Sequence, residues 1–120
     1  FDIIFAENAN GDILSDVGAG VIGGMGFAYA GNIGDSMGVF EPIHGTAPKY
    51  ADKNVVNPIA ALMAGKMMFE YLGEAETAAR LEQAIIDVLT EGRVRTYDLG
   101  GQSSTTDVAE AIAAKMRHNF

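Results

Sequence analysis

Two aspartates near the start of the chain have a spacing that suits a divalent metal ion. Asp12 and Asp16 lie four residues apart in a predicted helix, so their β-carbons should be roughly 5–6 Å apart on one face. Two carboxylates at that distance repel each other unless a cation lies between them, and their oxygens are ligands that magnesium and manganese prefer. The plainer interpretation is that Asp12 caps the helix and Asp16 is solvated. Taken alone, the spacing favours that interpretation, because such pairs are common.

A long loop at residues 41–57 carries a second group of polar side chains. Structureless segments of this length are usually functional or disordered. Gly45 and Thr46 could donate backbone N–H groups to a phosphate. Lys49 could add a cation and Tyr50 a phenol O–H. The pattern indicates an anion-binding loop.

The end of the same loop could bind a nucleobase. The amide of Asn57 has both a donor and an acceptor for the polar edge of a base, and Val56 could lie against the face of the ring. The structural alternative for His44 is a side chain that hydrogen-bonds within a turn. Each residue is weak evidence by itself, so the loop has to be interpreted as a whole.

Residues 18–23 match the dinucleotide-binding pattern G-x-G-x-x-G. A functional copy of that pattern follows a strand and opens a helix. Here the preceding residues, 13–17, already have helical spacing. We therefore interpret the glycines as sites of close packing between small residues, and not as a phosphate-binding turn.

Hydrophobic periodicity and turn residues predict the elements that position these groups. Extended segments are expected at residues 1–6, 27–35 and 36–43, the first as a buried strand. Helices are expected from Asn10 or Asp12 onward and at 58–72, 75–90 and 105–118, with a loop containing a short extended piece at 93–104. This order predicts an α/β fold. The strands are too few for the helices to cover, so we expect upstream sequence to supply others.

Composition excludes several classes of protein. With 120 residues, the chain is one small domain or part of a larger one. The absence of cysteine excludes disulfides, zinc–thiolate sites and cysteine nucleophiles, and it fits a reducing compartment. Sixteen acidic against eight basic residues give a net charge of −8, which argues against nucleic acid and anionic membranes as partners. We expect a cytoplasmic protein, with the mitochondrial matrix as the alternative.

Four stretches together resemble the β-decarboxylating dehydrogenases of the isocitrate/isopropylmalate dehydrogenase family. They are E-N-x-x-G-D-I-L-S-D at 7–16, F-E-P-I-H-G-T-A-P at 40–48, N-P at 57–58 and D-L-G-G at 98–101. The resemblance covers the whole chain and is strongest to the C-terminal portion of isocitrate dehydrogenases. It implies a layered α/β fold, with a mixed sheet flanked by helices, that is not a Rossmann fold. Residues 1–23 would end the small catalytic domain, and residues 24–120 would form the C-terminal part of the large cofactor-binding domain.

The resemblance also implies roles for particular residues. Asp12 and Asp16 fall on two aspartates that bind magnesium or manganese, which reverses the plainer interpretation of that pair. The implied cofactor-binding residues are Glu41, His44, Gly45, Thr46, Ala47, Lys49, Tyr50, Val56, Asn57 and Tyr97. The general acid and base would lie upstream, in an active site shared between the subunits of a homodimer.

The resemblance favours NADP over NAD as the cofactor. Lys49 and Tyr50 stand where NADP-using isocitrate dehydrogenases place Lys and Tyr to bind the 2′-phosphate, whereas NAD users place Asp and Ile. Tyr97 would fit the same pattern. The arginine expected four residues later is Gly101, and residues 98–101 resemble NAD users, so NAD remains the alternative.

The implied reaction is metal-dependent oxidative decarboxylation of a small 2-hydroxy acid, with isocitrate favoured as the substrate. The alternatives are an isopropylmalate, homoisocitrate or tartrate dehydrogenase, or a non-catalytic nucleotide-binding fragment or subunit. We expect the 120 residues alone to be inactive, because the catalytic acid, the base and the residues that bind the substrate carboxylates are missing from them.

Overall fold

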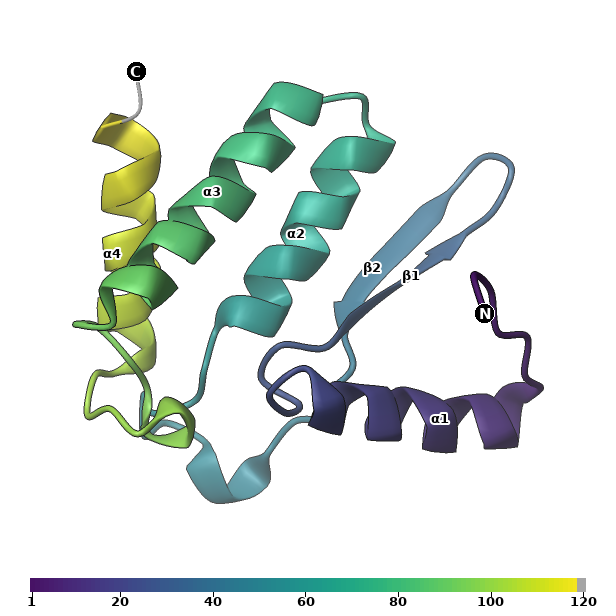
Figure 1. The fold of residues 1–120 in the computed structure, drawn as a ribbon, viewed down its shortest axis with the longest axis horizontal. Helices are drawn as coiled ribbons and strands as arrows, with labels where there is room; N and C mark the ends of the chain where they lie inside the picture. Colours follow the sequence, from purple (N-terminus) through teal and green to yellow (C-terminus); the bar gives the residue numbers. More distant parts are fainter. Residues whose placement is uncertain (119–120) are drawn as a thin grey trace.

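The computed structural model describes residues 1–118 and combines four α-helices with one β-hairpin (Figure 1). The elements are α1 (Asn8–Val21), β1 (Tyr29–Ile33), β2 (Gly38–Pro42), the 3-10 helix η1 (Pro48–Tyr50), α2 (Ile59–Tyr71), α3 (Ala75–Glu91), the 3-10 helix η2 (Tyr97–Leu99) and α4 (Thr105–His118). Helices α2, α3 and α4 lie beside one another, the hairpin lies along α2, and α1 extends away from this group.

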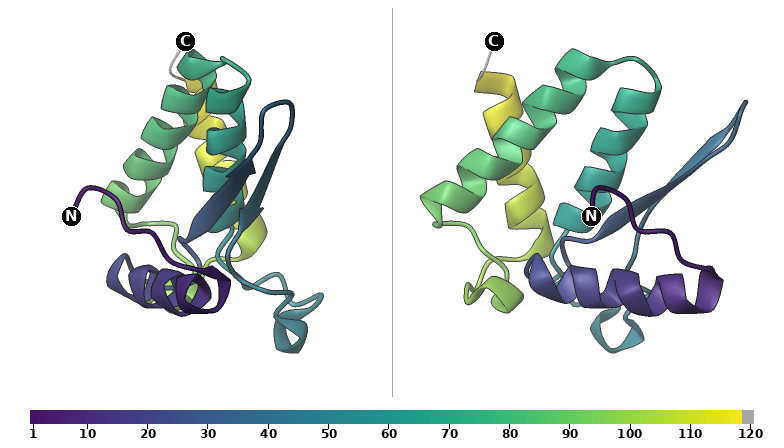
Figure 2. Two further views of the ribbon diagram at one scale, coloured as in Figure 1. Left: turned by 90° about the vertical axis from the view of Figure 1, so that its right-hand side faces the viewer. Right: turned by 45° about the vertical axis from the view of Figure 1, so that its right-hand side comes forward.

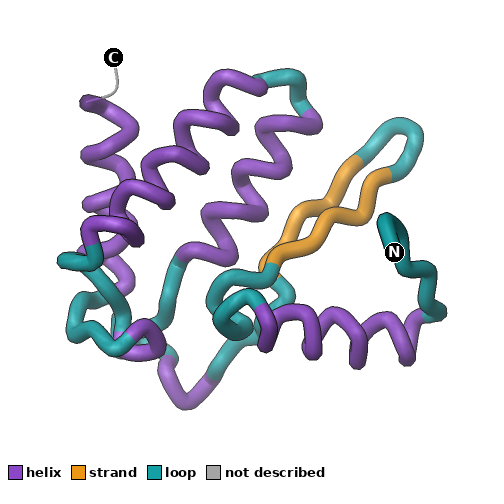
Figure 3. The backbone as a smooth tube through the Cα atoms, in the orientation of Figure 1, coloured by secondary structure: helices purple, strands orange, loops and turns teal. Residues whose placement is uncertain are grey.

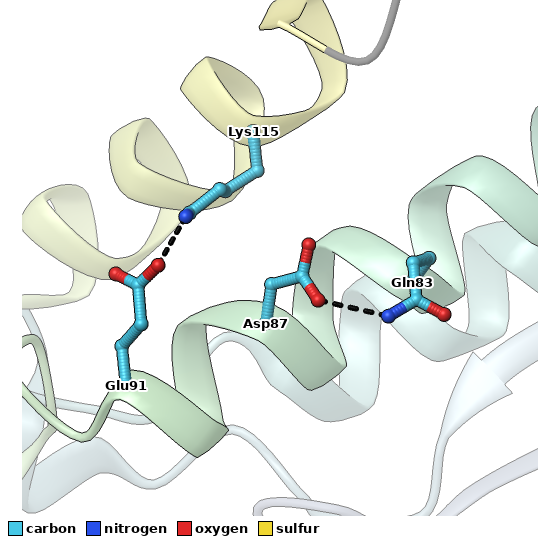
Figure 4. Close-up of polar contacts among 4 residues, drawn as sticks. All are labelled: Gln83, Asp87, Glu91 and Lys115. Atoms are coloured by element: carbon cyan, nitrogen blue, oxygen red, sulfur yellow. Dashed lines mark hydrogen bonds and ion pairs between the residues drawn. The ribbon is translucent and has the colours of Figure 1, made fainter.

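The hydrophobic core lies between α2, α3 and α4. Its buried members are Ile59, Leu81, Ala84, Ile85, Val88, Val108 and Ile112. Burying an aliphatic side chain of this size contributes about 1.5–3 kcal/mol relative to leaving it exposed. At the surface, an ion pair between Lys115 and Glu91 also joins α4 to α3 (Figure 4). The predictions of helices at 58–72, 75–90 and 105–118 are confirmed to within one residue at each end.

The hairpin is antiparallel and packs against α2. Its register pairs Tyr29 with Pro42 and Ile33 with Gly38, which confirms extended structure within 27–35 and 36–43. Gly31 faces α2, and a β-carbon there would lie 2.6 Å from the sulfur of Met67, so a larger residue would require the Met67 side chain to move. The left-hand view of Figure 2 shows the hairpin beside α2.

Two predicted extended pieces are absent from the described residues. Residues 1–6 form no strand, and the prediction that they are buried is wrong, since five of the six are exposed. A strand needs a neighbour for its backbone hydrogen bonds, and within residues 1–118 the single sheet pairs β1 only with β2. The 93–104 loop contains the helical turn η2 instead of an extended piece (Figure 3), because Gly100 at φ 73° closes the turn by donating its N–H to the Tyr97 carbonyl.

Helix α1 begins earlier than predicted and lies apart from the core. Its N-cap is Glu7, whose carboxylate accepts from the N–H groups of Ala9 at 3.2 Å and Asn10 at 3.3 Å. Neither Asn10 nor Asp12 is the cap. Within residues 1–118, α1 packs against no other helix or strand, and a turn containing Gly23 and Gly24 follows it. None of the helices in this range has the length and hydrophobicity needed to cross a membrane.

The close packing at Gly101 predicts a large loss of stability for Gly101→Ala. A β-carbon at this position would lie 2.0 Å from the carbonyl oxygen of Arg95, so the 95–103 loop would have to shift. We expect a decrease of about 2 kcal/mol in the free energy of unfolding, typical of overpacking. Urea denaturation measures this value.

Gly65→Ala is the matched control. Gly65 lies within α2 and a β-carbon there would meet nothing within 4 Å. Because alanine favours the helix by about 1 kcal/mol over glycine, this variant should be more stable than the unmodified protein. Equal stability of the two alanine variants would contradict the close packing described at Gly101.

Candidate functional site

A pocket of about 560 Å³ opens where four separate parts of the chain meet. It is lined by the glycine-rich turn 23–26, by the loop residues 44–47, 50–52, 54 and 56–57, by Tyr97 and Asp98, and by Thr105 at the start of α4. Its volume lies within the range of about 300–1,000 Å³ that is usual for sites that bind small molecules and cofactors.

Most of the residues predicted to bind a cofactor are brought together in this pocket. The lining includes His44, Gly45, Thr46, Ala47, Tyr50, Val56, Asn57 and Tyr97. Glu41 and Lys49 lie outside the lining formed by residues 1–118. Glu41 is exposed on β2, where its carboxylate accepts from the side-chain amide of Asn32 at 3.5 Å. Lys49 is exposed on η1, directly before Tyr50.

The loop that forms one wall of the pocket has a constrained backbone. Ala47, Asp52 and Asn54 all adopt left-handed conformations, with φ of 46°, 61° and 53°. Such conformations are costly for residues other than glycine and tend to cluster at functional sites. Asn54 is held through both its main chain and its side chain. Its carbonyl accepts from the N–H of Thr105 at 3.0 Å, and its side-chain oxygen accepts from the N–H and hydroxyl of Thr106. The start of α4 therefore holds this wall in place.

Asn57 and Asp98 join the two opposite walls. The Asn57 side chain is buried, with 6% exposure, and its Nδ2 donates to Asp98 Oδ2 at 3.0 Å. Its Oδ1 accepts from the N–H of Ile59 at 3.0 Å, so the same amide also satisfies the first turn of α2. The hydroxyl of Thr96 donates to the other Asp98 oxygen. Gly26 packs closely against this pair, because a β-carbon there would lie within 3.2 Å of both Asn57 and Asp98 and would require them to shift.

Two tyrosines lie together at the pocket, one from each wall. The rings of Tyr50 and Tyr97 have centroids 5.8 Å apart and planes inclined at 32°. Hydrogen bonding to Tyr50 raises the pKa of the Tyr97 phenol above its ordinary value of 10.0, and desolvation and the negative charge of Asp98 act in the same direction. Together with His44 and the carboxylates of Asp52 and Asp98, these phenols give the pocket both hydrogen-bond donors and acceptors.

Several lining residues had no role in the sequence interpretation. They are the turn residues 24–26, Ala51, Asp52, Asn54 and Thr105, together with Gly23 and Asp98, which were noted only as parts of motifs. The glycines of the turn were a detectable signal, since Gly23 and Gly24 have φ of 115° and 110° that other residues rarely adopt. The hydrogen bonds of Asn54 and Asp98 connect distant parts of the chain and left no such local signal.

The G-x-G-x-x-G pattern at 18–23 is not a phosphate-binding turn. Gly18 and Gly20 lie inside α1 and not at the start of a helix, as the sequence indicated. The expectation that these glycines pack closely is wrong within the described chain, because a β-carbon at Gly18 or Gly20 would meet nothing within 4 Å. Only Gly23, beyond the end of the helix, reaches the pocket.

Asp12 and Asp16 lie on α1, away from the pocket lining, and both are exposed. Within residues 1–118 neither carboxylate makes a hydrogen bond or an ion pair, and no cluster of three potential metal ligands is present. Two carboxylates one helical turn apart fit a magnesium-type ion only if substrate, water or another chain supplies the remaining ligands.

Comparison with known proteins gives consistent matches across the chain. The family model for isocitrate/isopropylmalate dehydrogenase matches residues 1–112. An isocitrate/homoisocitrate dehydrogenase of Thermus thermophilus is 49% identical over 117 residues, covering 98% of this chain and 35% of the relative. An NADP isocitrate dehydrogenase from the same species is 50% identical, covering 93% and 23%. A 3-isopropylmalate/3-methylmalate dehydrogenase of Methanocaldococcus jannaschii is 46% identical, covering 98% and 35%.

Solved structures agree with the sequence comparisons. The crystal structure of isocitrate dehydrogenase from Methylococcus capsulatus superposes with a TM-score of 0.88 at 47% identity, covering 92% of this chain and 33% of that one. The expected fold, that of the isocitrate dehydrogenase family, is therefore confirmed for the part that this chain represents. The chain spans about a third or less of the length of these relatives.

The tyrosine pair predicts that Tyr50→Phe will lower the pKa of Tyr97 toward 10.0, because the variant keeps the ring and removes the hydroxyl. The raised pKa means that the folded state favours the neutral phenol. The stability contributed is thus fully present below the ordinary tyrosine pKa and is lost as the pH rises through the folded-state pKa. A pH titration of labelled tyrosine ring signals by NMR measures the change.

The control is Tyr71→Phe, because Tyr71 packs against Phe40 and lies outside the pocket lining of residues 1–118. It should leave the titration of Tyr97 as it is in the unmodified protein. An unchanged Tyr97 midpoint in Tyr50→Phe would show that the two phenols do not interact.

Proposed function

The chain belongs to the isocitrate/isopropylmalate dehydrogenase family, and we propose that it forms part of a metal-dependent enzyme that oxidises and decarboxylates a 2-hydroxy acid. The observation that carries this proposal is the pocket, in which eight residues expected to bind a nicotinamide cofactor lie together. Isocitrate is the favoured substrate, because the motifs of this chain resemble those of isocitrate dehydrogenases most, and the identity to an NADP isocitrate dehydrogenase is 50% against 46% to a 3-isopropylmalate/3-methylmalate dehydrogenase. Isopropylmalate, homoisocitrate and tartrate are the alternatives.

In this proposal the pocket holds the adenosine end of the dinucleotide. Its volume suits a nucleoside, and the buried amide of Asn57 offers polar atoms to the edge of the base. Within the described residues the backbone N–H groups of Gly45 and Thr46 make no hydrogen bond, so they are available to a phosphate or ribose oxygen. The binding energy gained here would hold the distant nicotinamide ring in position for hydride transfer.

We propose NADP as the cofactor, with NAD as the alternative. Lys49 lies on η1, one residue before the lining residue Tyr50, and its long side chain would give a 2′-phosphate a charge-assisted hydrogen bond. Tyr50 and Tyr97 add two phenol donors from facing walls. The negative charge of the Asp52 carboxylate would repel a phosphate, which favours the NAD alternative. Both oxygens of Asp98 already accept hydrogen bonds from Asn57 and Thr96. No arginine could replace Gly101 without moving the Arg95 backbone.

The proposed metal ligands from this chain are Asp12 and Asp16, with magnesium or manganese as the ion. Their position on one exposed face of α1, with no partner among residues 1–118, supports a shared site to which substrate and other protein segments contribute. A bound ion would act as a Lewis acid on the hydroxyl and carboxylate oxygens of the substrate. The glycine turn that follows α1 also lines the cofactor pocket, so it connects the two halves of the proposed site.

The domain assignment and the partner are further parts of the proposal. Residues 1–23 would end a small catalytic domain, and residues 24–120 would belong to a large cofactor-binding domain. The exposed apolar side chains of Ile13, Leu14 and Val17, at 65%, 42% and 61%, support burial of α1 against other protein, as in a homodimer that shares its active site. The proposed location is the cytoplasm, with the mitochondrial matrix as the alternative.

A second candidate is a non-catalytic nucleotide-binding fragment or subunit. The observation that favours it is that the chain spans only 35% and 23% of the length of the two Thermus thermophilus relatives. In either case we propose that the general acid and base lie outside these 120 residues and that this chain alone has no dehydrogenase activity.

The proposal predicts that Asp12→Asn and Asp16→Asn each abolish most of the metal-dependent turnover in the complete natural protein. We expect kcat/KM for isocitrate to fall by about a hundredfold or more, because a Lewis-acid ion contributes several kcal/mol to transition-state stabilisation. The concentration of magnesium or manganese needed for half-maximal activity should rise. Initial rates of nicotinamide reduction at varied metal concentration provide the measurement.

Asp35→Asn is the matched control, since Asp35 is an exposed aspartate in the turn between β1 and β2. It should retain the activity and metal dependence of the unmodified protein. If Asp12→Asn and Asp16→Asn both keep the rates of the unmodified protein, the assignment of these residues as metal ligands is wrong. If the natural protein never reduces a nicotinamide cofactor, the non-catalytic alternative is favoured.

A further inference from the structure

The amide of Asn57 is held by two partners of opposite polarity. Its oxygen accepts from the backbone N–H of Ile59 at 3.0 Å, and its nitrogen donates to the carboxylate of Asp98 at 3.0 Å. An N–H group can only donate, and a carboxylate can only accept. Reversing the amide would therefore place its NH2 group against the N–H of Ile59 and its oxygen against the carboxylate of Asp98. Both contacts would be unfavourable, and Asn57 is buried.

This arrangement leaves one hydrogen-bond donor for a ligand. The amide nitrogen carries two N–H groups, and Asp98 accepts from one of them. Asn57 lines the pocket, so its second N–H is the donor that it offers there. The group that matches it is an acceptor on the edge of a heteroaromatic base, such as the N1 atom of adenine.

We propose that Asp98 is a positioning residue for nucleobase recognition: its carboxylate fixes the Asn57 amide so that an N–H, and not a carbonyl oxygen, faces the base. The inference rests on the proposed function, because it presumes that the pocket holds a purine nucleotide. It extends that function by assigning the choice between adenine and other purines to a residue that acts through Asn57.

The surroundings of Asp98 favour this role over a casual surface contact. Its second oxygen accepts from the hydroxyl of Thr96, which is completely buried. Gly26 lies against the pair, and a β-carbon there would come within 3.1 Å of the Asn57 side chain and 3.2 Å of the Asp98 carboxylate. The carboxylate therefore has a fixed place between three chain segments, and it transmits that placement to the Asn57 amide.

The first test replaces Asp98 by asparagine in the complete natural protein. Weakening one hydrogen bond to a charged acceptor should raise KM for the dinucleotide roughly five- to tenfold, with kcat and KM for the hydroxy acid changed by less than about twofold. The ratio of kcat/KM for the adenine dinucleotide to that for its hypoxanthine analogue should fall as well. Hypoxanthine is informative because its N1 carries a hydrogen where adenine N1 accepts one.

Asp87→Asn is the control of the same chemical type. Asp87 lies on α3 and accepts from Gln83 at 2.8 Å at the surface, outside the pocket lining of residues 1–118 (Figure 4). This variant should match the unmodified protein in both KM values and in the ratio of the two dinucleotides.

The decisive test exchanges the pair, with Asn57→Asp and Asp98→Asn combined. Every hydrogen bond of the pair can re-form. The carboxylate at position 57 accepts from the N–H of Ile59 and from the amide nitrogen at position 98, and the amide oxygen at position 98 accepts from the hydroxyl of Thr96. The exchange thus keeps the hydrogen bonds and the packing, while the carboxylate at the buried position 57 lowers the melting temperature somewhat; circular dichroism identifies the folded variant, which keeps the test available even if Asp98→Asn alone fails to fold. It replaces the Asn57 side-chain N–H at the pocket with an acceptor, so the preference should move from adenine toward hypoxanthine.

The outcomes separate this inference from the proposed function. A lowered adenine preference in Asp98→Asn and a preference shifted to hypoxanthine in the exchange variant support it. An exchange variant that keeps the original adenine preference would overturn it and leave the pair a structural link. A natural protein that reduces neither dinucleotide would refute the proposed function, and the inference would fail with it.

Discussion

The hydrogen bond between Asn57 and Asp98 is the contact on which the pocket depends. It joins residues 41 positions apart in the sequence, and Gly26, which has no side chain, packs closely against both partners. The same Asn57 amide satisfies the first turn of α2 through Ile59, which is itself a core residue. One wall of the pocket is therefore continuous with the hydrophobic core, so the geometry of the proposed site depends on the stability of the fold.

The proposed metal-binding half of the site has no comparable support. Helix α1 packs against no other helix or strand within residues 1–118, and its apolar side chains are largely exposed. Its position relative to the pocket is set by the turn at Gly23 and Gly24, whose backbone conformation suits glycine alone. Contacts with other protein, from the same chain or a partner subunit, would have to fix Asp12 and Asp16 in place for catalysis.

The sequence predicted local features well and long-range links poorly. Helices α2, α3 and α4 follow from apolar periodicity, which depends only on neighbouring residues, and the family was identified from motifs that are continuous in the sequence. The strand expected at 1–6 failed because a strand requires a partner that local pattern cannot supply. The role of Asp98 was missed for the same reason, since its partners Asn57 and Gly26 are distant in sequence.

The central claim is that the pocket between the 44–57 loop and Tyr97 holds the adenosine half of a nicotinamide cofactor. A crystal structure of the complete natural protein with bound NADP tests it most directly. The account predicts adenine within hydrogen-bond distance of the Asn57 amide nitrogen and the 2′-phosphate close to Lys49, Tyr50 and Tyr97. Adenosine bound elsewhere, with this pocket filled only by solvent, would contradict it.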